Sequence, residues 1–159
     1  MSDRDLMNVV RSGWPQIVQD EDYVDGANLT AGMLVEETAD GFQPHSVAGG
    51  TVDLPVVAKD MRGRGYEVDP TKTYEDGDFI TFLQVNGGAN LTMLLDTDED
   101  LSTAYPGGET RLVSAGNGRL RQFDSGGGDT EDAVVATIQE AADATGEADG
   151  LPVAVEVTR

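Results

Sequence analysis

The sequence predicts a mainly β protein, a compact barrel or sandwich of short strands preceded by an extended N-terminal arm. Short apolar-rich runs recur along the chain, and Gly, Asn and Asp lie between them, which is the composition of strands joined by tight turns. The most regular part, residues 74–123, holds two pairs of such runs. We expect these pairs to form the sheet around which one β-rich domain, residues 27–159, is built, with residues 1–26 as the arm.

Both pairs of runs predict hairpins. Phe79–Val85 and Asn90–Leu95 flank Asn-Gly-Gly-Ala, and residues 111–115 and 119–123 flank Gly-Asn-Gly. Asn and Gly accept the positive φ angles that tight turns require.

Further strands are expected on either side of this stretch. Residues 31–37 and 42–45 flank the turn Ala-Asp-Gly, and residues 54–58 form an apolar run typical of a buried strand, in which Pro55 suggests an edge or a strand start. Leu151–Val157 alternates apolar and other residues and should be the closing strand.

Residues 130–143 are ambiguous. Their acidic start and the apolar residues at helical spacing favour a helix. A strand over residues 133–140 is the alternative.

The N-terminal residues 1–26 allow two interpretations. Residues 3–10 can form about two helical turns before Gly13-Trp14-Pro15 breaks the pattern. The segment either folds back on its own core or extends and docks its apolar residues on a neighbouring subunit. The only Trp, Trp14, would anchor such a contact.

Composition restricts the partners. Thirty acidic residues against ten basic ones give a formal charge of −20, a balance that opposes binding to nucleic acid or anionic membranes. An acidic surface with only two lysines is typical of a protein from molar salt, where the Debye length falls to about 3 Å. The charged N-terminus predicts neither a signal peptide nor a membrane helix, and we expect a soluble protein.

No catalytic or cofactor site is predicted. The chain has no Cys, so disulfides and thiolate metal sites are excluded. The acidic run 96–100 departs from the calcium-loop pattern, because Leu101 and Gly107 stand where Gly and Glu are required. His45, the only histidine, has no triad spacing around it and is predicted at the surface or in a turn. We therefore expect a protein that is not an enzyme and binds no metal or cofactor.

The order of these features resembles that of the small capsid decoration (cement) proteins of tailed viruses. The resemblance covers about residues 27–159 and rests on residues 31–50, 54–80, 108–123 and 152–157 in sequence. Within them, residues 62–66 match a Gly-Lys-Gly-like loop followed by Tyr, with Arg in place of Lys, and Gly77-Asp78 match a Gly-Asp before a strand. The family also has a strand at 133–140 paired with the closing strand, so a strand is predicted there.

This resemblance implies a non-enzymatic structural protein on the outer surface of an icosahedral capsid. It would stabilise the shell by bridging major capsid protein subunits, as a homotrimer, after synthesis in the host cytoplasm. Combined with the acidic surface, it implies a virus of a halophilic organism, most simply an archaeon. The alternative is a vertex turret, spike or tail component of the same virion that serves host attachment.

The predicted interface with the capsid or a neighbouring subunit combines the arm with arginines. Its residues are Val9, Val10, Trp14, Ile17, Val18, Arg62, Arg64, Arg111, Arg119 and Arg121. The arginines would form bidentate pairs with capsid carboxylates, or alternatively would balance carboxylates of this chain. Deletion of residues 1–26 is expected to abolish shell binding and leave the β fold intact.

Overall fold

The computed structural model describes residues 10–12, 17–26, 28–52, 56–58, 69–103 and 110–158. These residues form a mainly β, sandwich-like fold of two sheets, which confirms the predicted fold class. The strands are β1 (Val10–Ser12), β2 (Ile17–Tyr23), β3 (Leu34–Thr38), β4 (Gly41–Pro44), β5 (Val56–Ala58), β6 (Phe79–Val85), β7 (Asn90–Leu95), β8 (Arg111–Ser114), β9 (Leu120–Gln122), β10 (Ala136–Ile138) and β11 (Leu151–Val157), with one short 3-10 helix, η1 (Glu131–Ala133). No helix among the described residues is long and apolar enough to cross a membrane.

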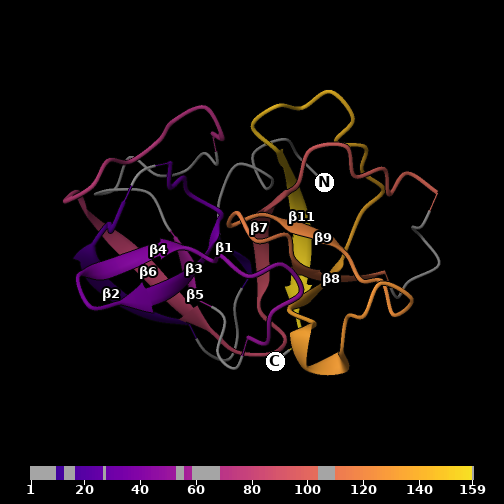
Figure 1. The fold of residues 1–159 in the computed structure, drawn as a ribbon, viewed down its shortest axis with the longest axis horizontal. Helices are drawn as coiled ribbons and strands as arrows, with labels where there is room; N and C mark the ends of the chain where they lie inside the picture. Colours follow the sequence, from indigo (N-terminus) through magenta and orange to yellow (C-terminus); the bar gives the residue numbers. More distant parts are fainter. Residues whose placement is uncertain are drawn as a thin grey trace.

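The two sheets are built largely from different halves of the chain. The five-stranded sheet has the order β2-β6-β5-β3-β4, and the six-stranded sheet has the order β1-β7-β11-β10-β8-β9. In Figure 1 the five-stranded sheet lies on the left and the six-stranded sheet on the right. Apart from β1, the strands up to β6 therefore build the five-stranded sheet, and the strands from β7 onward build the six-stranded sheet.

The main core lies between the sheets. Leu34, Val57 and Leu83 contribute from the five-stranded sheet, and Met93 and Leu112 are among the residues that face them from the six-stranded sheet. All five are at most 3% exposed. Burial of a side chain of this size contributes about 1.5–3 kcal/mol, so this shared core is what holds the two sheets together.

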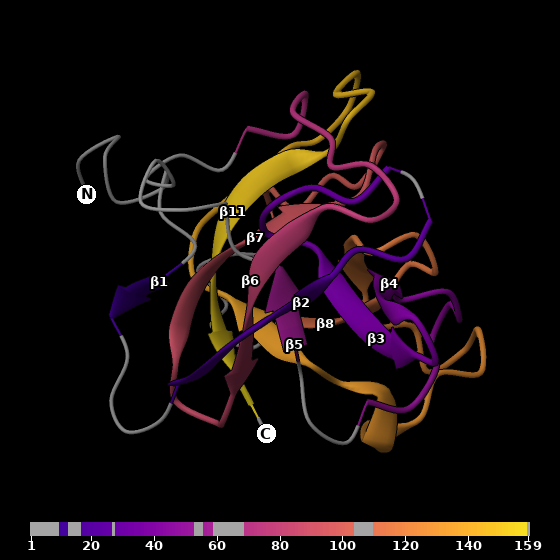
Figure 2. The same ribbon diagram turned by 90° about the vertical axis from the view of Figure 1, so that its left-hand side faces the viewer.

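The five-stranded sheet curls so that its two edge strands meet at one end. Val24, directly after β2, forms a parallel bridge with Phe42 of β4, and Asp25 N–H donates to Phe42 O at 2.8 Å. Figure 2 shows β2 crossing toward β4. The curl encloses a second apolar cluster of Val24, Leu29, Val35, Ala58, Ile80 and Phe82, against which Phe42, Val56 and Tyr74 pack.

The predicted hairpin of Phe79–Val85 with Asn90–Leu95 is wrong, although both strands have the predicted bounds. β6 pairs with β2 and β5, whereas β7 pairs with β1 and β11. Each strand is central in its own sheet and nearly all of its residues are buried, so neither has a free edge for the other. The Gly-rich link between them carries the chain from one sheet to the other, and Val157 N–H donates to Ala89 O there.

The other predicted pairings are confirmed. β8 and β9 form the second hairpin, β3 and β4 form the hairpin across Ala39-Asp40, and β11 closes the sheet between β7 and β10. The strand predicted over residues 133–140 is present as β10 and pairs with the closing strand, but it is only three residues long, and residue 133 belongs to η1.

The described part of the arm pairs with this chain's own sheets. β2 pairs with β6 along all seven residues, and β1 pairs with β7 at Val10 and Ser12. Val24, at 1% exposure, belongs to the second cluster. This is the fold-back alternative for the arm, and it argues against a β fold that survives deletion of residues 1–26. Residues 1–9, including the start of the predicted helical turns, lie outside the described residues.

Candidate functional site

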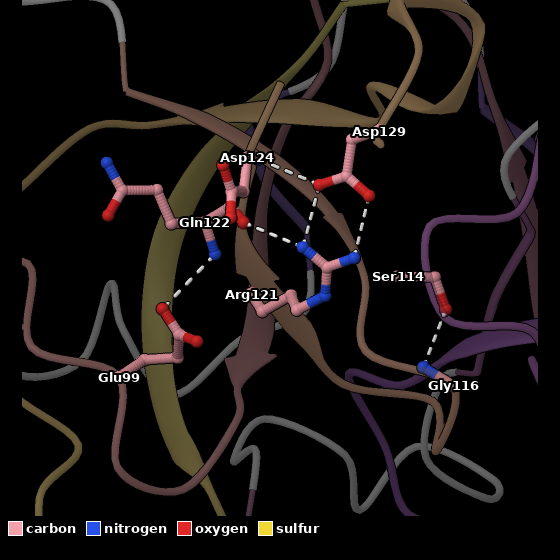
Figure 3. A network of polar contacts seen from close by, with 7 residues as sticks. All are labelled: Glu99, Ser114, Gly116, Arg121, Gln122, Asp124 and Asp129. Atoms are coloured by element: carbon pink, nitrogen blue, oxygen red, sulfur yellow. Dashed lines mark hydrogen bonds and ion pairs between the residues drawn. The ribbon is translucent and has the colours of Figure 1, made fainter. Parts of the chain in front are cut away.

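Arg121, one of the predicted interface residues, binds a carboxylate of its own chain (Figure 3). Its Nη1 and Nη2 donate to Asp129 Oδ2 and Oδ1, both at 2.7 Å. Asp124 N–H also donates to Asp129 Oδ2, at 2.8 Å. The hydrogen bonds from Arg121 lower the pKa of the Asp129 carboxyl, and the same bonds raise the pKa of Arg121. The pair is partly buried, with Asp129 only 6% exposed.

The other two described arginines of the predicted interface also pair with carboxylates of this chain. Arg111 forms an ion pair with Glu131, and its guanidinium carbon lies 4.1 Å from the centroid of the Phe123 ring. Arg119 Nη1 lies 3.3 Å from Asp96 Oδ1, and its buried Nε has no hydrogen-bond partner.

The β8–β9 hairpin thus carries all three arginines, and each one faces an acidic residue of the same chain. This arrangement is the second of the two interpretations given for them. Of the remaining predicted residues, Val10 lies in β1, and Ile17 and Val18 lie in β2. Val9, Trp14, Arg62 and Arg64 lie outside the described residues.

A pocket of about 550 Å³ opens on the five-stranded sheet, over residues that the sequence analysis did not select. Its apolar lining includes Val35, Phe42 and Val56, which belong to or pack against the second cluster. The rings of Phe42 and Phe82 pack at a tilt of 34°, with their centroids 4.4 Å apart. Part of the pocket lining is therefore the partly buried margin of the second cluster.

Three acidic residues line the same pocket: Asp22 from β2 and Glu36 and Glu37 from β3. Glu36 Oε1 accepts hydrogen bonds from Gln43 and Ser46. Burial by itself raises the pKa of Glu36, but these hydrogen bonds outweigh it and the pKa lies below its ordinary value. Neither Asp22 nor Glu37 forms an ion pair with any described residue.

His45 lines the pocket, and of the two positions predicted for it, at the surface or in a turn, the surface position is wrong. The residue is 7% exposed, and its Nδ1 lies 2.7 Å from Ser114 Oγ of β8. Ser114 Oγ also accepts the Gly116 N–H, at 3.1 Å, so this hydroxyl links the His45 ring to the turn after β8. Burial lowers the pKa of His45, and nearby Glu36 offsets only part of this effect. The imidazole is therefore neutral at pH 7.

The local sequence indicated only some of the residues that line this pocket. Glu36-Glu37 stand at the end of a predicted strand, and His45 follows the return strand. The curl that brings Asp22 beside them depends on pairing between distant segments. Within the described part of the chain, no three His, Asp or Glu side chains converge as metal ligands do.

Comparison with solved structures finds the same fold in a phage protein. The structure of the head fiber gp8.5 N base in bacteriophage phi29 matches with a TM-score of 0.52 over 90% of this chain and 95% of that chain. The two sequences are 12% identical, so the likeness is one of fold. No protein-family model and no curated protein match this sequence.

Proposed function

We propose that this chain is a structural protein of a virus head, which binds the outer surface of an icosahedral capsid and bridges major capsid protein subunits. The observation that carries the proposal is the fold shared with a phage head fiber base, over nearly the full length of both chains. The order of sequence features leads independently to capsid decoration proteins. The proposed protein is not an enzyme, and its role depends on surfaces rather than on a reaction.

Binding to the capsid would be strengthened by the number of contacts that each oligomer makes at once. A homotrimer that engages several capsid subunits gains through avidity, so each single contact needs only modest affinity. With its formal charge of −20, the protein would serve in the virion of a halophilic host, where salt screens repulsion between neighbouring copies.

A second candidate is a vertex component that serves host attachment. The matched structure is itself described as the base of a head fiber, which favours a position where a fiber or spike is mounted. The two candidates differ in copy number, since decoration covers all equivalent positions of the shell and a vertex component covers few.

The test is binding to expanded heads that lack the protein, in molar salt. We expect the protein to sediment with the heads, and cryo-EM to show its density across subunit boundaries over the whole outer surface. Density at vertices alone would replace decoration with the second candidate. Heads that remain bare at saturating protein concentration would refute both.

A further inference from the structure

The six-stranded sheet closes into a ring of strands that is complete only when β1 is in place. β7, β11, β10, β8 and β9 pair in that order, and β9 returns to β7 through a single parallel pair, Leu95 with Leu120. The other end of the same β7 edge, at Asn90 and Leu91, is covered by β1. A copy in which β1 is displaced would expose main-chain groups of a largely apolar strand, and such an edge pairs readily with other chains.

The pairing of β1 with the rest of the fold is short. β1 pairs with β7 only at Val10 and Ser12, and the register shifts between these two residues. By contrast, β2 pairs with β6 along seven residues. In the described part of the chain β1 has no other strand as a neighbour. Displacing it costs few hydrogen bonds, and an identical strand from another copy restores all of them.

The segment between β1 and β2 has the sequence of a stiff hinge. Four residues, Gly-Trp-Pro-Gln, separate these two strands, which belong to different sheets. Pro15 has a fixed φ, and it disfavours helical backbone at Trp14, so this dipeptide is biased towards extended backbone. Short connections that are under strain favour the exchange of strands between identical chains.

The distribution of charge also allows a neighbouring copy to receive β1. Residues 1–12 contain two Asp and two Arg, so the formal charge of −20 lies in the rest of the chain. Two copies of the acidic body repel each other, whereas the neutral arm does not add to this repulsion. The receiving strand, Asn90–Leu95, has no charged residue. The contact therefore consists of main-chain hydrogen bonds and apolar packing, which salt does not screen.

We propose that β1 is exchanged between copies of this chain, so that β1 of one copy covers the β7 edge of the next. The occupant of that edge is a second copy, and the strand pairs are those that the fold already contains within one chain. The five peptide steps from Ser12 to Ile17 span at most about 18 Å, so the β7 edge of the next copy lies within that distance of Ile17. Repeated around a symmetry axis, the exchange closes a ring of copies. Only the number of copies, a trimer, rests on the proposed function.

The test uses disulfides, because the natural chain has no Cys. Ser12→Cys and Asn90→Cys stand at paired positions of β1 and β7, and paired Cα atoms of antiparallel strands lie about 4.5–5.5 Å apart, within the reach of a disulfide. The two single variants are mixed in urea, refolded together in molar salt and oxidised. We expect a disulfide between residues 12 and 90 of different copies, identified by mass spectrometry of the linked peptides. The double variant should form covalent oligomers on a non-reducing gel.

A matched pair in the body of the fold controls for random contact between copies. Thr137→Cys and Glu156→Cys stand at paired positions of β10 and β11, which are not exchanged, so the double variant should form an internal disulfide and the mixed single variants none. Three results would each overturn the proposal: only internal disulfides between residues 12 and 90, no disulfide between them at all, or equal linking between copies in the control pair.

A second measurement leaves both strands unchanged. Pro15→Gly removes the bias towards extended backbone in the hinge and should weaken self-association about fivefold, measured by light scattering in molar salt. Pro70→Gly, in a turn outside the arm, should leave the association unchanged. Equal association of the two variants, or a wild-type chain that stays monomeric, would contradict the exchange.

Binding of the wild-type chain to expanded heads is scored separately. If heads are decorated by copies that do not exchange β1, the exchange is wrong and the proposed function stands. If copies exchange β1 but leave heads bare, the proposed function fails and the exchange stands.

Discussion

Asp129 is the most completely buried carboxylate among the ion pairs of the described residues, and it accepts hydrogen bonds from Arg121 and from the Asp124 backbone. Asp129→Asn should lower the free energy of unfolding by about 1–3 kcal/mol, because a charge-assisted pair is lost and a guanidinium is left without its counter-ion. Urea unfolding at neutral pH measures the difference. Asp149→Asn, in an exposed loop, is the control and should be close to neutral.

The same variant makes a prediction about pH. The pKa of Asp129 is lowered in the folded state, so its stabilising effect is present above the ordinary carboxyl value of 3.8 and is lost as the pH falls through the lower folded value. The stability difference between wild type and Asp129→Asn should therefore shrink in acid. A difference that stays constant down to the acid limit would contradict the assigned pair.

The burial of His45 leads to a second prediction about stability and pH, at higher pH than the one for Asp129. Its pKa is lowered by burial, so as the pH falls below the ordinary value of 6.5 the unfolded chain takes up a proton before the folded chain does. Stability should decline as the pH falls through this value, and His45→Gln should flatten the decline. The NMR titration of the single histidine should have its midpoint below 6.5; a midpoint above that value would show that the ring is not buried as described.

Among the elements, the junction of β2 with β4 is the one that depends most on a single residue. Gly41 has a φ of +144°, and a β-carbon there would lie 2.1 Å from Tyr23 O. Gly41→Ala should destabilise the protein by about 3 kcal/mol or more, because the added methyl group forces the two strands apart. Its effect is measured by urea unfolding.

Gly77→Ala provides the matched comparison. Gly77 also has a positive φ, +86°, but a β-carbon there meets nothing within 4 Å. Its cost should be the backbone strain alone, about 1–2 kcal/mol. If the two substitutions cost the same, β2 and β4 do not approach each other as the structure shows.

The elements also show what local sequence could predict. The bounds of β6, β7 and β11 follow from apolar runs that end at turn residues. The β8–β9 hairpin follows from a turn of the same kind, because each of its strands has a neighbour on the chain and few other partners. Pairing between strands that are far apart in the chain has no such signal in the local sequence. The link between β6 and β7 has the composition of a hairpin turn, yet burial on both faces places the two strands in different sheets.

The candidate site was harder to predict than the fold for the same reason. The arginines of the β8–β9 hairpin stand out in the sequence, because basic residues are rare in this chain. Their partners, such as Asp129 and Glu131, do not stand out, because they are two of thirty acidic residues. Likewise, the hydrogen-bond partner of the buried His45 is Ser114, which lies 69 positions away in the sequence.

At the scale of the whole molecule, charge should control stability. With a formal charge of −20, carboxylates repel one another in dilute buffer, and the folded state brings them closer than the unfolded chain does. The midpoint of thermal unfolding should rise steeply between about 0.1 M and 2 M potassium chloride, as the Debye length falls from about 10 Å to below 3 Å.

A control with a neutral osmolyte distinguishes the electrostatic screening of surface charges by salt from a general stabilisation of buried apolar surface. Betaine at matched osmolality should raise the midpoint much less than potassium chloride does. A midpoint that is flat across the salt range would contradict both the electrostatic argument and the proposal of a halophilic host.

The passage of the chain between sheets at residues 86–89 has a consequence for synthesis. β6 can pair with β2 and β5 as soon as it leaves the ribosome, because both precede it in the chain. β7 follows at once, but its partner β11 spans Leu151–Val157 and is made only after β8, β9 and β10. Until β11 has been synthesised, the nascent protein therefore carries one sheet that can be formed and an apolar strand that lacks its main neighbour. Such an exposed edge is prone to pair with other chains, so the interval between β7 and β11 is when this protein most needs protection from its own copies.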